Sequence, residues 1–189
     1  MDDVSLSPRS PLDSLPTQPG SRVALAAAPP TARFIFRGGE TARARVARAL
    51  GLDPPDRLGL AAEREGRAAL WLGPDEWLLL AVDADPEMFP AEVTAAMEGA
   101  PHSLVDVSHR QVGLVVSGAG AARTLSSGCP LDLRDRAFPV GFATRTLFDK
   151  AEIVLWRRAA ETFHVEVWRS FSPYLAAALA EATRGAPAG

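Results

Sequence analysis

Hydrophobic positions follow two different spacings in the first part of the chain. A short apolar stretch at Arg22–Ala26 predicts an edge strand, and the stretch at Arg33–Arg37 predicts a better-defined strand. Apolar residues then recur at helical spacing over Glu40–Leu50, which predicts a helix with one apolar face. Gly51 suits the left-handed conformation that ends many helices, so we expect this helix to end there.

A hairpin and a second helix are expected next. Two apolar strands lie within 67–82 on either side of a Gly-Pro-Asp turn, in which proline presets the backbone for the first turn position. Helical spacing resumes and ends at Gly99, and the sequence leaves open whether this helix starts near Pro86 or at Pro90. A strand at Ser103–Val107 completes the order β-α-β-β-α-β, which is typical of a ferredoxin-like half.

The rest of the chain again alternates strands with helices. A short helix is expected over Ala119–Ser126, and a closing helix starts at Ser172, which is expected to cap it, with Pro173 in the first position. Helices that return between runs of strands predict an α+β fold of two ferredoxin-like halves with mostly antiparallel sheets. The remaining strands are expected near Val112–Ser117, Arg145–Phe148, Glu152–Arg157 and Thr162–Trp168.

Length and composition fit one folded domain between two short tails. The chain has 189 residues, 47% of them hydrophobic, which suffices for a sizeable core over 21–185, with halves of roughly 21–108 and 109–185. Residues 1–20 contain four prolines and no periodicity, so they are expected to form an irregular arm, and 186–189 a short tail. The arm is either solvated or an extended segment that orders on a partner, with Leu12 and Leu15 as its anchors.

Charge and cysteine content exclude several classes of protein. Nineteen of the 20 basic residues are arginines that alternate with acids, and the net charge is −3, so no stripe suited to nucleic acid is present. Apolar runs fall short of the roughly 20 residues that cross a bilayer, and the N-terminus lacks a secretion signal, so no membrane partner is expected. A single cysteine forms no intrachain disulfide, which favours the cytoplasm.

Two groups of residues resemble known binding or active-site motifs. The G-x-G at 118–120 has Arg123 where a dinucleotide-binding loop needs a third glycine, and a strand-to-helix turn needs a permissive backbone in any case. Asp106, Ser108 and His109 are the residue types of a hydrolase triad, but all three lie on one extended segment and His109 faces the other way. We therefore expect a polar strand end whose groups bond nearby backbone.

The remaining candidate groups are explained as well by structure as by chemistry. Cys129 has uncharged neighbours and no helix start just after it, so a small buried residue is as good an explanation as a reactive thiolate. The three histidines lack paired metal-ligand spacing, so neither a metal site nor any catalytic residue is predicted. The four tryptophans lie in expected strands, where core packing explains most of them, but Trp77 follows a hairpin turn and could be open to a partner.

Several blocks of the sequence together resemble one known family. These are "LWLGPDEWLLL" (70–80), "VDVSHRQVGLVVSGAGAARTLSSGCPLDL" (105–133), "FPVGFATRTLF" (138–148) and "FHVEVWRSFSPYLAAAL" (163–179), and the arm segment "SPLDSL" (10–15) is similar too. The blocks occur in the order found in the gamma subunit of heterotetrameric sarcosine oxidase and cover nearly everything after residue 21. "GPDEW" and "GCPLDL" are fairly specific only when they occur together.

The resemblance implies a fold, a role and a set of partners. The implied fold is that of the folate-binding domain of aminomethyltransferases, the glycine-cleavage T-proteins. The implied role is that of a small subunit, without catalytic residues, in a complex that oxidises sarcosine to glycine and hydrogen peroxide and forms methylenetetrahydrofolate. The resemblance places FAD, FMN, NAD and tetrahydrofolate on partner subunits and leaves this chain without a cofactor. The implied partners are the alpha, beta and delta subunits, with gamma packing chiefly on alpha.

The alternative is an independent folate-binding protein of the T-protein or YgfZ kind. YgfZ-like proteins carry a K-G-C-Y-x-G-Q-E segment, whereas the cysteine here lies in "SSGCPLDL", and the chain is about half as long as a full T-protein. An assembly role requires a partner-facing surface, which normally has an aromatic or arginine-anchored centre. Six residues are our candidates for that contact: Leu12, Leu15, Trp77, His109, Arg110 and Arg145.

Overall fold

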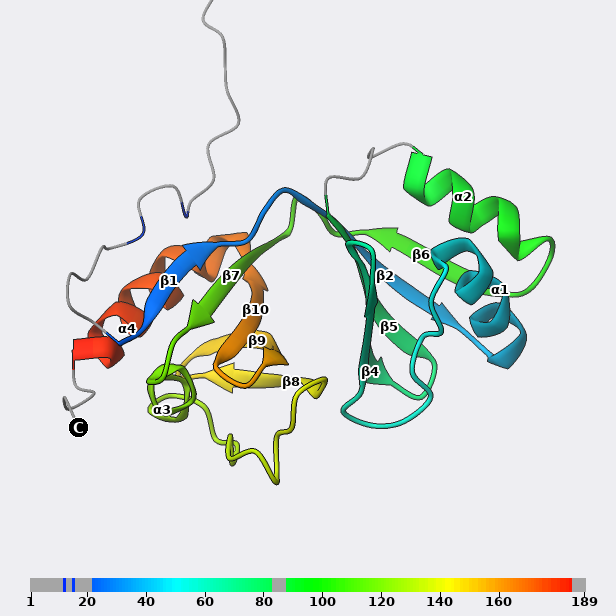
Figure 1. Cartoon of the computed structure of the whole chain (residues 1–189). Coiled ribbons are helices and arrows are strands. Elements are labelled where there is room, and N and C mark those ends of the chain that lie inside the picture. Colours follow the sequence, from blue (N-terminus) through cyan, green and yellow to red (C-terminus); the bar gives the residue numbers. More distant parts are fainter. Residues whose placement is uncertain (1–11, 13–14, 16–21, 83–87, 185–189) are drawn as a thin grey trace, which may run out of the picture.

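The structure, a computed structural model, describes residues 12, 15, 22–82 and 88–184. These residues form two five-stranded antiparallel sheets (Figure 1). Sheet A has the order β1 (Ala24–Ala27), β7 (Gln111–Ser117), β10 (Thr162–Trp168), β9 (Ala151–Ala159) and β8 (Ala143–Phe148). Sheet B has the order β3 (Ala61–Arg64), β4 (Arg67–Gly73), β5 (Glu76–Val82), β2 (Thr31–Gly38) and β6 (His102–Asp106).

Helices cover the outer face of each sheet (Figure 1). The helices α1 (Glu40–Leu50) and α2 (Met88–Met97) pack on sheet B through one hydrophobic core. Sheet A is covered by α3 (Ala121–Ser126) and by α4 (Ser172–Arg184), which follows the 3₁₀ turn η1 (Arg169–Phe171). A third apolar cluster, drawn from β4, β5, β8 and β9 among others, lies between the two sheets, so the molecule is layered helix, sheet, sheet, helix.

The predicted α+β class with mostly antiparallel sheets is confirmed, and most elements fall where the spacing placed them. One strand belongs to a different sheet from the one expected. The β1 strand precedes the first half in sequence but pairs with β7 of sheet A, with Leu25 opposite Val116. The β1 strand thus lies within the range 21–108 but belongs to sheet A, because it pairs with a strand about 90 residues away. The β3 strand was not predicted.

One smaller expectation is wrong, and others concern residues that the structure does not describe. Ser172 begins α4, but its hydroxyl donates to the carbonyl of Arg169, 2.8 Å away, instead of capping the helix amides. The described part of α2 spans Met88–Met97, which rules out Pro90 as its first residue. The expected tail 186–189, Pro86 and the arm apart from Leu12 and Leu15 lie outside the described residues.

Two paired connections join the sheets. The segment from β1 to β2 and the segment from β6 to β7 run side by side from one sheet to the other (Figure 1). They are bonded at this crossing, where the amide of Ala28 donates to the carbonyl of Gly113 at 2.8 Å. A second link lies at the sheet edges, where the amides of Ala61 and Ala143 donate to the carbonyls of Gly141 and Gly59, both at 2.8 Å. The polar site described below lies beside the crossing.

Candidate functional site

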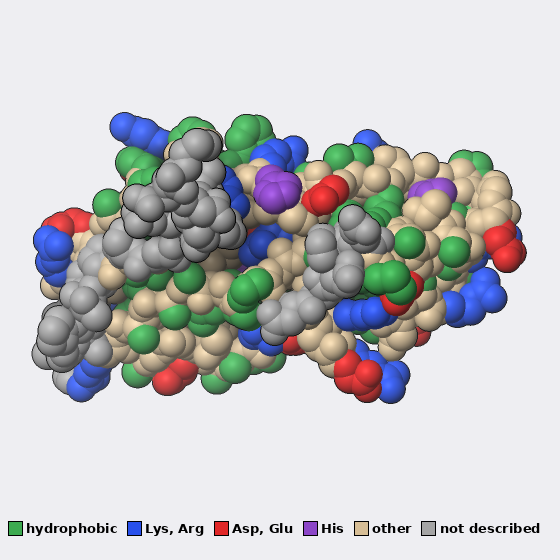
Figure 2. Space-filling view, turned by 90° about the horizontal axis from the view of Figure 1, so that it is seen from above, with side chains coloured by type: hydrophobic (Ala, Val, Ile, Leu, Met, Phe, Trp, Pro, Cys, Tyr) green, Lys and Arg blue, Asp and Glu red, His purple; other side chains and the backbone are tan. Residues whose placement is uncertain are grey.

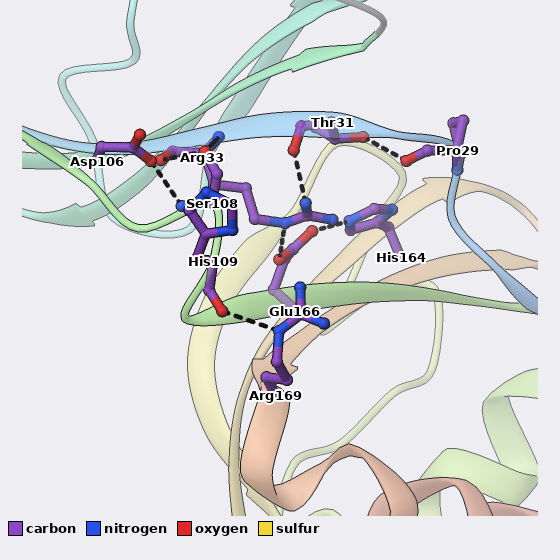
Figure 3. Close-up of polar contacts among 9 residues, drawn as sticks. All are labelled: Pro29, Thr31, Arg33, Asp106, Ser108, His109, His164, Glu166 and Arg169. Carbon is purple, nitrogen blue, oxygen red and sulfur yellow. Dashed lines mark hydrogen bonds and ion pairs between the residues drawn. The ribbon is translucent and has the colours of Figure 1, made fainter. Parts of the chain in front are cut away.

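Three ionisable side chains meet between the two sheets, close to the crossing (Figure 3). Arg33 comes from β2, whereas His164 and Glu166 come from β10. In β2 the flanking residues Ala32 and Phe34 face the helices, so strand alternation turns Arg33 toward sheet A. The Glu166 side chain is 0% exposed, and those of Arg33 and His164 are each 7% exposed. A charge buried this deeply requires a partner.

The cluster satisfies its own charges. Arg33 donates from Nε to Oε2 of Glu166 at 2.6 Å and from Nη1 to the carbonyl of Thr31 at 2.7 Å. The other carboxylate oxygen of Glu166 lies 2.7 Å from Nε2 of His164. Burial by itself raises the pKa of Glu166, but the hydrogen bonds and charges of His164 and Arg33 outweigh burial, so this pKa lies below its usual value. Glu166 is therefore held as a carboxylate that ties sheet A to sheet B.

Gly113 makes room for this contact. It lies opposite Glu166 in β7, and a methyl group on Gly113 would come within 2.8 Å of Oε1 of Glu166 and 3.0 Å of Nη2 of Arg33. The same methyl group would lie 2.8 Å from the side chain of Ala28. A side chain at this position would therefore push the two charged groups apart.

The strand break after β6 is tied to the same arginine (Figure 3). The amide of Ser108 donates to Oδ1 of Asp106 at 2.7 Å, and the amide of Arg33 donates to the hydroxyl of Ser108 at 2.9 Å. His109 is exposed, and its carbonyl accepts a hydrogen bond from Nε of Arg169 at 2.9 Å. The expectation that these polar groups bond nearby backbone is confirmed, and no hydrolase triad forms from Asp106, Ser108 and His109.

A cavity of about 480 Å³ lies beside the strand break. Its walls include apolar residues of the link between β1 and β2, together with Arg33, Ser108, Gln111 and Arg169. This volume is within the range of small-molecule pockets. The cationic group of Arg33 is already neutralised by Glu166, so Arg169 is the more available positive charge in the wall.

The G-x-G and the cysteine have structural explanations. Gly118 has φ +106°, and a methyl group there would come within 2.2 Å of the carbonyl oxygen of Arg22, so the turn after β7 requires glycine where the segment before β1 passes. Cys129 is buried, and its Sγ lies 3.6 Å from the hydroxyl of Thr146. Among the described residues, no three histidine, cysteine or acidic side chains are grouped as a metal site would need.

Two of the six expected partner contacts are buried inside the chain itself, and a third is partly buried against it. Trp77 is 1% exposed, lies in the core of sheet B, and donates from Nε1 to the carbonyl of Pro55 at 2.7 Å. Leu12 is 3% exposed within the core of sheet A, and Leu15 packs against the same core. Trp77 and Leu12 are therefore covered by the chain itself, whereas Leu15 stays a predicted partner contact. Trp77 follows a hairpin turn but is buried, because the segment at Pro55 covers its indole.

The other three expected contacts are exposed, and two of them lie close together. The Arg110 guanidinium stacks over the Trp168 ring at 5.3 Å, and Nη2 of Arg145 lies 2.5 Å from Oε1 of Glu76. Arg110 and Arg145 line one small cavity of about 170 Å³ between the sheets, whereas His109 lies on the other side of the break, against the larger cavity.

The buried cluster is the part of the site that pattern analysis missed. A signal for it was present, because each charged residue stands between two apolar ones within its strand: Arg33 between Ala32 and Phe34, and Glu166 between Val165 and Val167. Charged residues are seldom buried unless they are paired, so two such interruptions in different strands indicate a cross-sheet ion pair.

Comparisons with known proteins agree with this architecture. The chain is 37% identical over 128 residues to a sarcosine oxidase subunit gamma from Arthrobacter sp, and 35% identical over 132 residues to one from Corynebacterium sp. (strain P-1). The matched parts cover 67% and 69% of this chain and span 62% and 64% of those relatives. No helix among the described residues is long and apolar enough to cross a membrane.

Solved structures show the same fold. A chain of the heterotetrameric sarcosine oxidase from Corynebacterium sp. U-96, in complex with pyrrole 2-carboxylate, matches with a TM-score of 0.82 at 30% identity, covering 90% of this chain and 88% of that one. The glycine cleavage system aminomethyltransferase T from Bartonella henselae matches with a TM-score of 0.66 at 17% identity, covering 84% of this chain and 45% of that one, which shows the fold alone. A model of the sarcosine oxidase gamma subunit family matches residues 38–185, and with these relatives it shows that the chain belongs to that family.

Proposed function

We propose that this protein is the non-catalytic gamma subunit of a heterotetrameric sarcosine oxidase. The complex oxidatively demethylates sarcosine to glycine and hydrogen peroxide, and it forms methylenetetrahydrofolate when tetrahydrofolate is present. Gamma contributes to assembly and stability through contact with alpha, and beta and delta complete the tetramer. FAD, FMN, NAD and tetrahydrofolate belong to partner subunits, and the complex works in the cytoplasm.

One structural observation carries the non-catalytic role. The side chains best suited to chemistry are all used as links at the sheet crossing: Glu166 and Ser108 bond Arg33, and His164 bonds Glu166. Glu166 is enclosed and kept ionised, so it is unsuited to exchange protons with a substrate near neutral pH. The polar groups therefore act as structural links between sheets A and B. Family membership and the likeness to a chain of a heterotetrameric enzyme support the assembly role.

Omission of gamma tests the assembly role. We would co-express alpha, beta, gamma and delta, and in parallel alpha, beta and delta alone, and measure the yield of intact complex, its thermal stability and its turnover of sarcosine. We expect a lower yield and a lower melting temperature without gamma. If omission changes neither yield, stability nor turnover, the assembly role is wrong.

The isolated subunit tests the absence of chemistry. The purified full chain is expected to show no sarcosine oxidation and no flavin absorbance. A stoichiometric flavin band in its visible spectrum would contradict the non-catalytic assignment. The control is the wild-type tetramer assayed in the same buffer, because its activity shows that the assay detects the enzyme when it is present.

The cavity of about 480 Å³ supports a second candidate, an independent folate-binding protein. The two candidates differ in what the chain binds alone. Calorimetric titration of the isolated chain with tetrahydrofolate is expected to show no binding if the chain is a gamma subunit. Saturable binding with a Kd in the micromolar range, lost on Arg169→Ala, would favour the second candidate.

A further inference from the structure

The small cavity between the sheets has one apolar wall and one polar wall. Its volume is about 170 Å³. Ile35, Leu72 and Leu78 of sheet B form the apolar wall. On the side of sheet A the lining is largely polar and charged: Arg110, Gln111, Arg145, Glu152, Glu166 and Trp168. Sites for small molecules combine apolar surface with a few converging polar groups in the same way.

Strand pairing turns the polar side chains of sheet A toward this cavity. Gln111 of β7 lies opposite Trp168 of β10. The residue before Trp168, Val167, pairs with Ile153 of β9, and both belong to the core under the helices. Side chains alternate between the two faces of a strand, so Trp168 and Glu152 point the other way, toward sheet B. Gln111 shares their face, because it is paired with Trp168.

Two opposite charges line the cavity without an ion pair. The guanidinium of Arg110 stacks over the Trp168 ring, 5.3 Å from its centroid. The Glu152 side chain is exposed at the end of the sheet layer. Within the described part of the chain, neither Arg110 nor Glu152 forms an ion pair, with each other or with a third group. The cavity therefore offers one free cation and one free anion among the described residues.

The other charges of the lining are already neutralised. Arg145 pairs with Glu76 of sheet B. Both carboxylate oxygens of Glu166 are occupied, Oε2 by Arg33 and Oε1 by His164. The face of the molecule in Figure 2 has basic and acidic side chains interspersed, so no broad field of one sign covers that face. A ligand of this cavity is therefore selected by the free charges of the lining.

The lining also needs a hydrogen-bond donor. Gln111 is 6% exposed, and its Oε1 has no hydrogen-bond partner among the described residues. A buried polar atom without a partner is costly. An amide oxygen only accepts hydrogen bonds, so its partner must carry an N–H or O–H group. An ammonium group meets this requirement, and it is also attracted by the carboxylate of Glu152.

We propose that this cavity binds a small α-amino acid as its zwitterion. The carboxylate of the ligand lies beside Arg110, and its ammonium group donates to Glu152 and to Oε1 of Gln111. A ligand with only a negative charge would meet Glu152, and one with only a positive charge would meet Arg110, so a molecule that carries both charges fits the lining best.

The volume limits the size of this amino acid. About 170 Å³ corresponds to about five or six water molecules, at roughly 30 Å³ each. Glycine, alanine and sarcosine have a similar number of non-hydrogen atoms, and a methyl group can rest on the apolar wall of sheet B. The site goes beyond the proposed function, because it lies on this chain itself. The proposed function only suggests glycine and sarcosine as the first probes.

Calorimetric titration of the purified full chain with glycine and sarcosine tests the proposal. We expect saturable binding of one molecule per chain. Acetate and methylammonium each carry one of the two charges, and they should bind at least tenfold more weakly. Phenylalanine is too large for the cavity and should not bind. If neither glycine nor sarcosine binds, the cavity holds only water and the proposal is wrong. If acetate or methylammonium binds as tightly as glycine, recognition of a zwitterion is wrong.

Three single variants place the ligand in this cavity. Arg110→Gln and Glu152→Gln each remove one of the free charges, and each should weaken the binding of glycine at least tenfold. Arg123→Gln is the matched control, because Arg123 is an exposed arginine of α3, in the helix layer on the other face of sheet A. It should bind glycine like wild type. Equal binding of glycine by all three variants would overturn the proposal.

Thermal unfolding of each full-length chain shows whether it is folded. Should the isolated chain unfold, the assembled complex is titrated with glycine, once with wild-type gamma and once with the Glu152→Gln chain. We expect the variant complex to bind one glycine fewer, and an unchanged number of bound molecules would overturn the proposal. A chain that binds glycine but does not assemble with alpha, beta and delta would confirm the site and contradict the proposed function.

Discussion

Replacement of Glu166 by glutamine is the most direct test of the buried cluster. The substitution keeps the shape of the side chain but removes its charge, which leaves Arg33 buried without an anion. His164 also loses its carboxylate neighbour, since the two groups lie 2.7 Å apart. The change acts between the sheets and touches neither helix layer, so the expected effect is on stability.

The expected loss of folding stability follows from the burial of both charged groups. Breaking a buried ion pair by removing one partner costs about 3–5 kcal/mol. The glutamine carbonyl can still accept from Nε of Arg33, so we expect the lower end, about 3 kcal/mol. With a urea dependence of about 2 kcal/mol/M, the unfolding midpoint should fall by roughly 1.5 M. This is a large part of the stability of a typical domain.

Urea unfolding of the full chain, followed by tryptophan fluorescence and circular dichroism, measures this change. Glu152→Gln is the control, because Glu152 is exposed on the neighbouring strand. A double variant, Arg33→Met with Glu166→Leu, should be less destabilised than the sum of its single variants, since it leaves no charge unpaired. A midpoint shift below about 0.3 M for Glu166→Gln, or strict additivity in the double variant, would refute the reasoning.

The same residue predicts a pH dependence. The pKa of Glu166 is lower in the folded chain than its ordinary value of 4.5, so the folded chain holds the carboxylate more strongly than the unfolded chain does. Its stabilising contribution is then complete above about pH 4.5 and is lost as the pH falls toward the folded pKa. Glu166→Gln should flatten that acid limb of the stability curve, and an unchanged limb would contradict the assignment.

Three further changes have defined outcomes. Gly113→Ala should cost about 1–3 kcal/mol in thermal unfolding because its methyl group meets Ala28 and Glu166, whereas Gly39→Ala, whose methyl group meets no atom within 4 Å, should cost less. An NMR titration should give Asp132 a pKa of about 2, since Arg134 donates a hydrogen bond to it, and Arg134→Gln should return this pKa toward 3.8. Cys129→Ala should leave sarcosine turnover of the complex within a few fold, and a loss of about a thousandfold would indicate a nucleophile.

Local spacing predicted the elements well but could not assign every strand to its sheet. The predicted strand at 162–168 coincides with β10, because its alternation comes from one face that packs on helices α3 and α4. The β1 strand has the same kind of signal, yet its place in sheet A depends on a hydrogen-bonded partner, β7, far along the chain. Spacing reports which face of a strand is buried, and it carries no information on which strand lies beside it.

The candidate site also depends on contacts between distant residues, which local spacing does not predict. Pattern analysis singled out Asp106, Ser108 and His109 because they lie close together in sequence. In the structure the Ser108 hydroxyl accepts from the amide of Arg33, and Asp106 accepts from the amide of Ser108. Trp77 was weighed as a partner contact because it follows a turn, but the segment at Pro55 covers it. Arg33 and Glu166 are 133 positions apart, so only the pairing of the two sheets brings them together.

The geometry of the buried cluster gives a reason for ionised groups in the interior of this chain. Apolar side chains between sheets A and B would stabilise the layer, but they would tolerate sliding of one sheet over the other. Arg33 accepts a single geometry, because it must reach Glu166, the Thr31 carbonyl and, through its backbone, Ser108 at the same time. Any slip of one residue would bury an unpaired charge. The cluster therefore fixes how sheet A lies against sheet B.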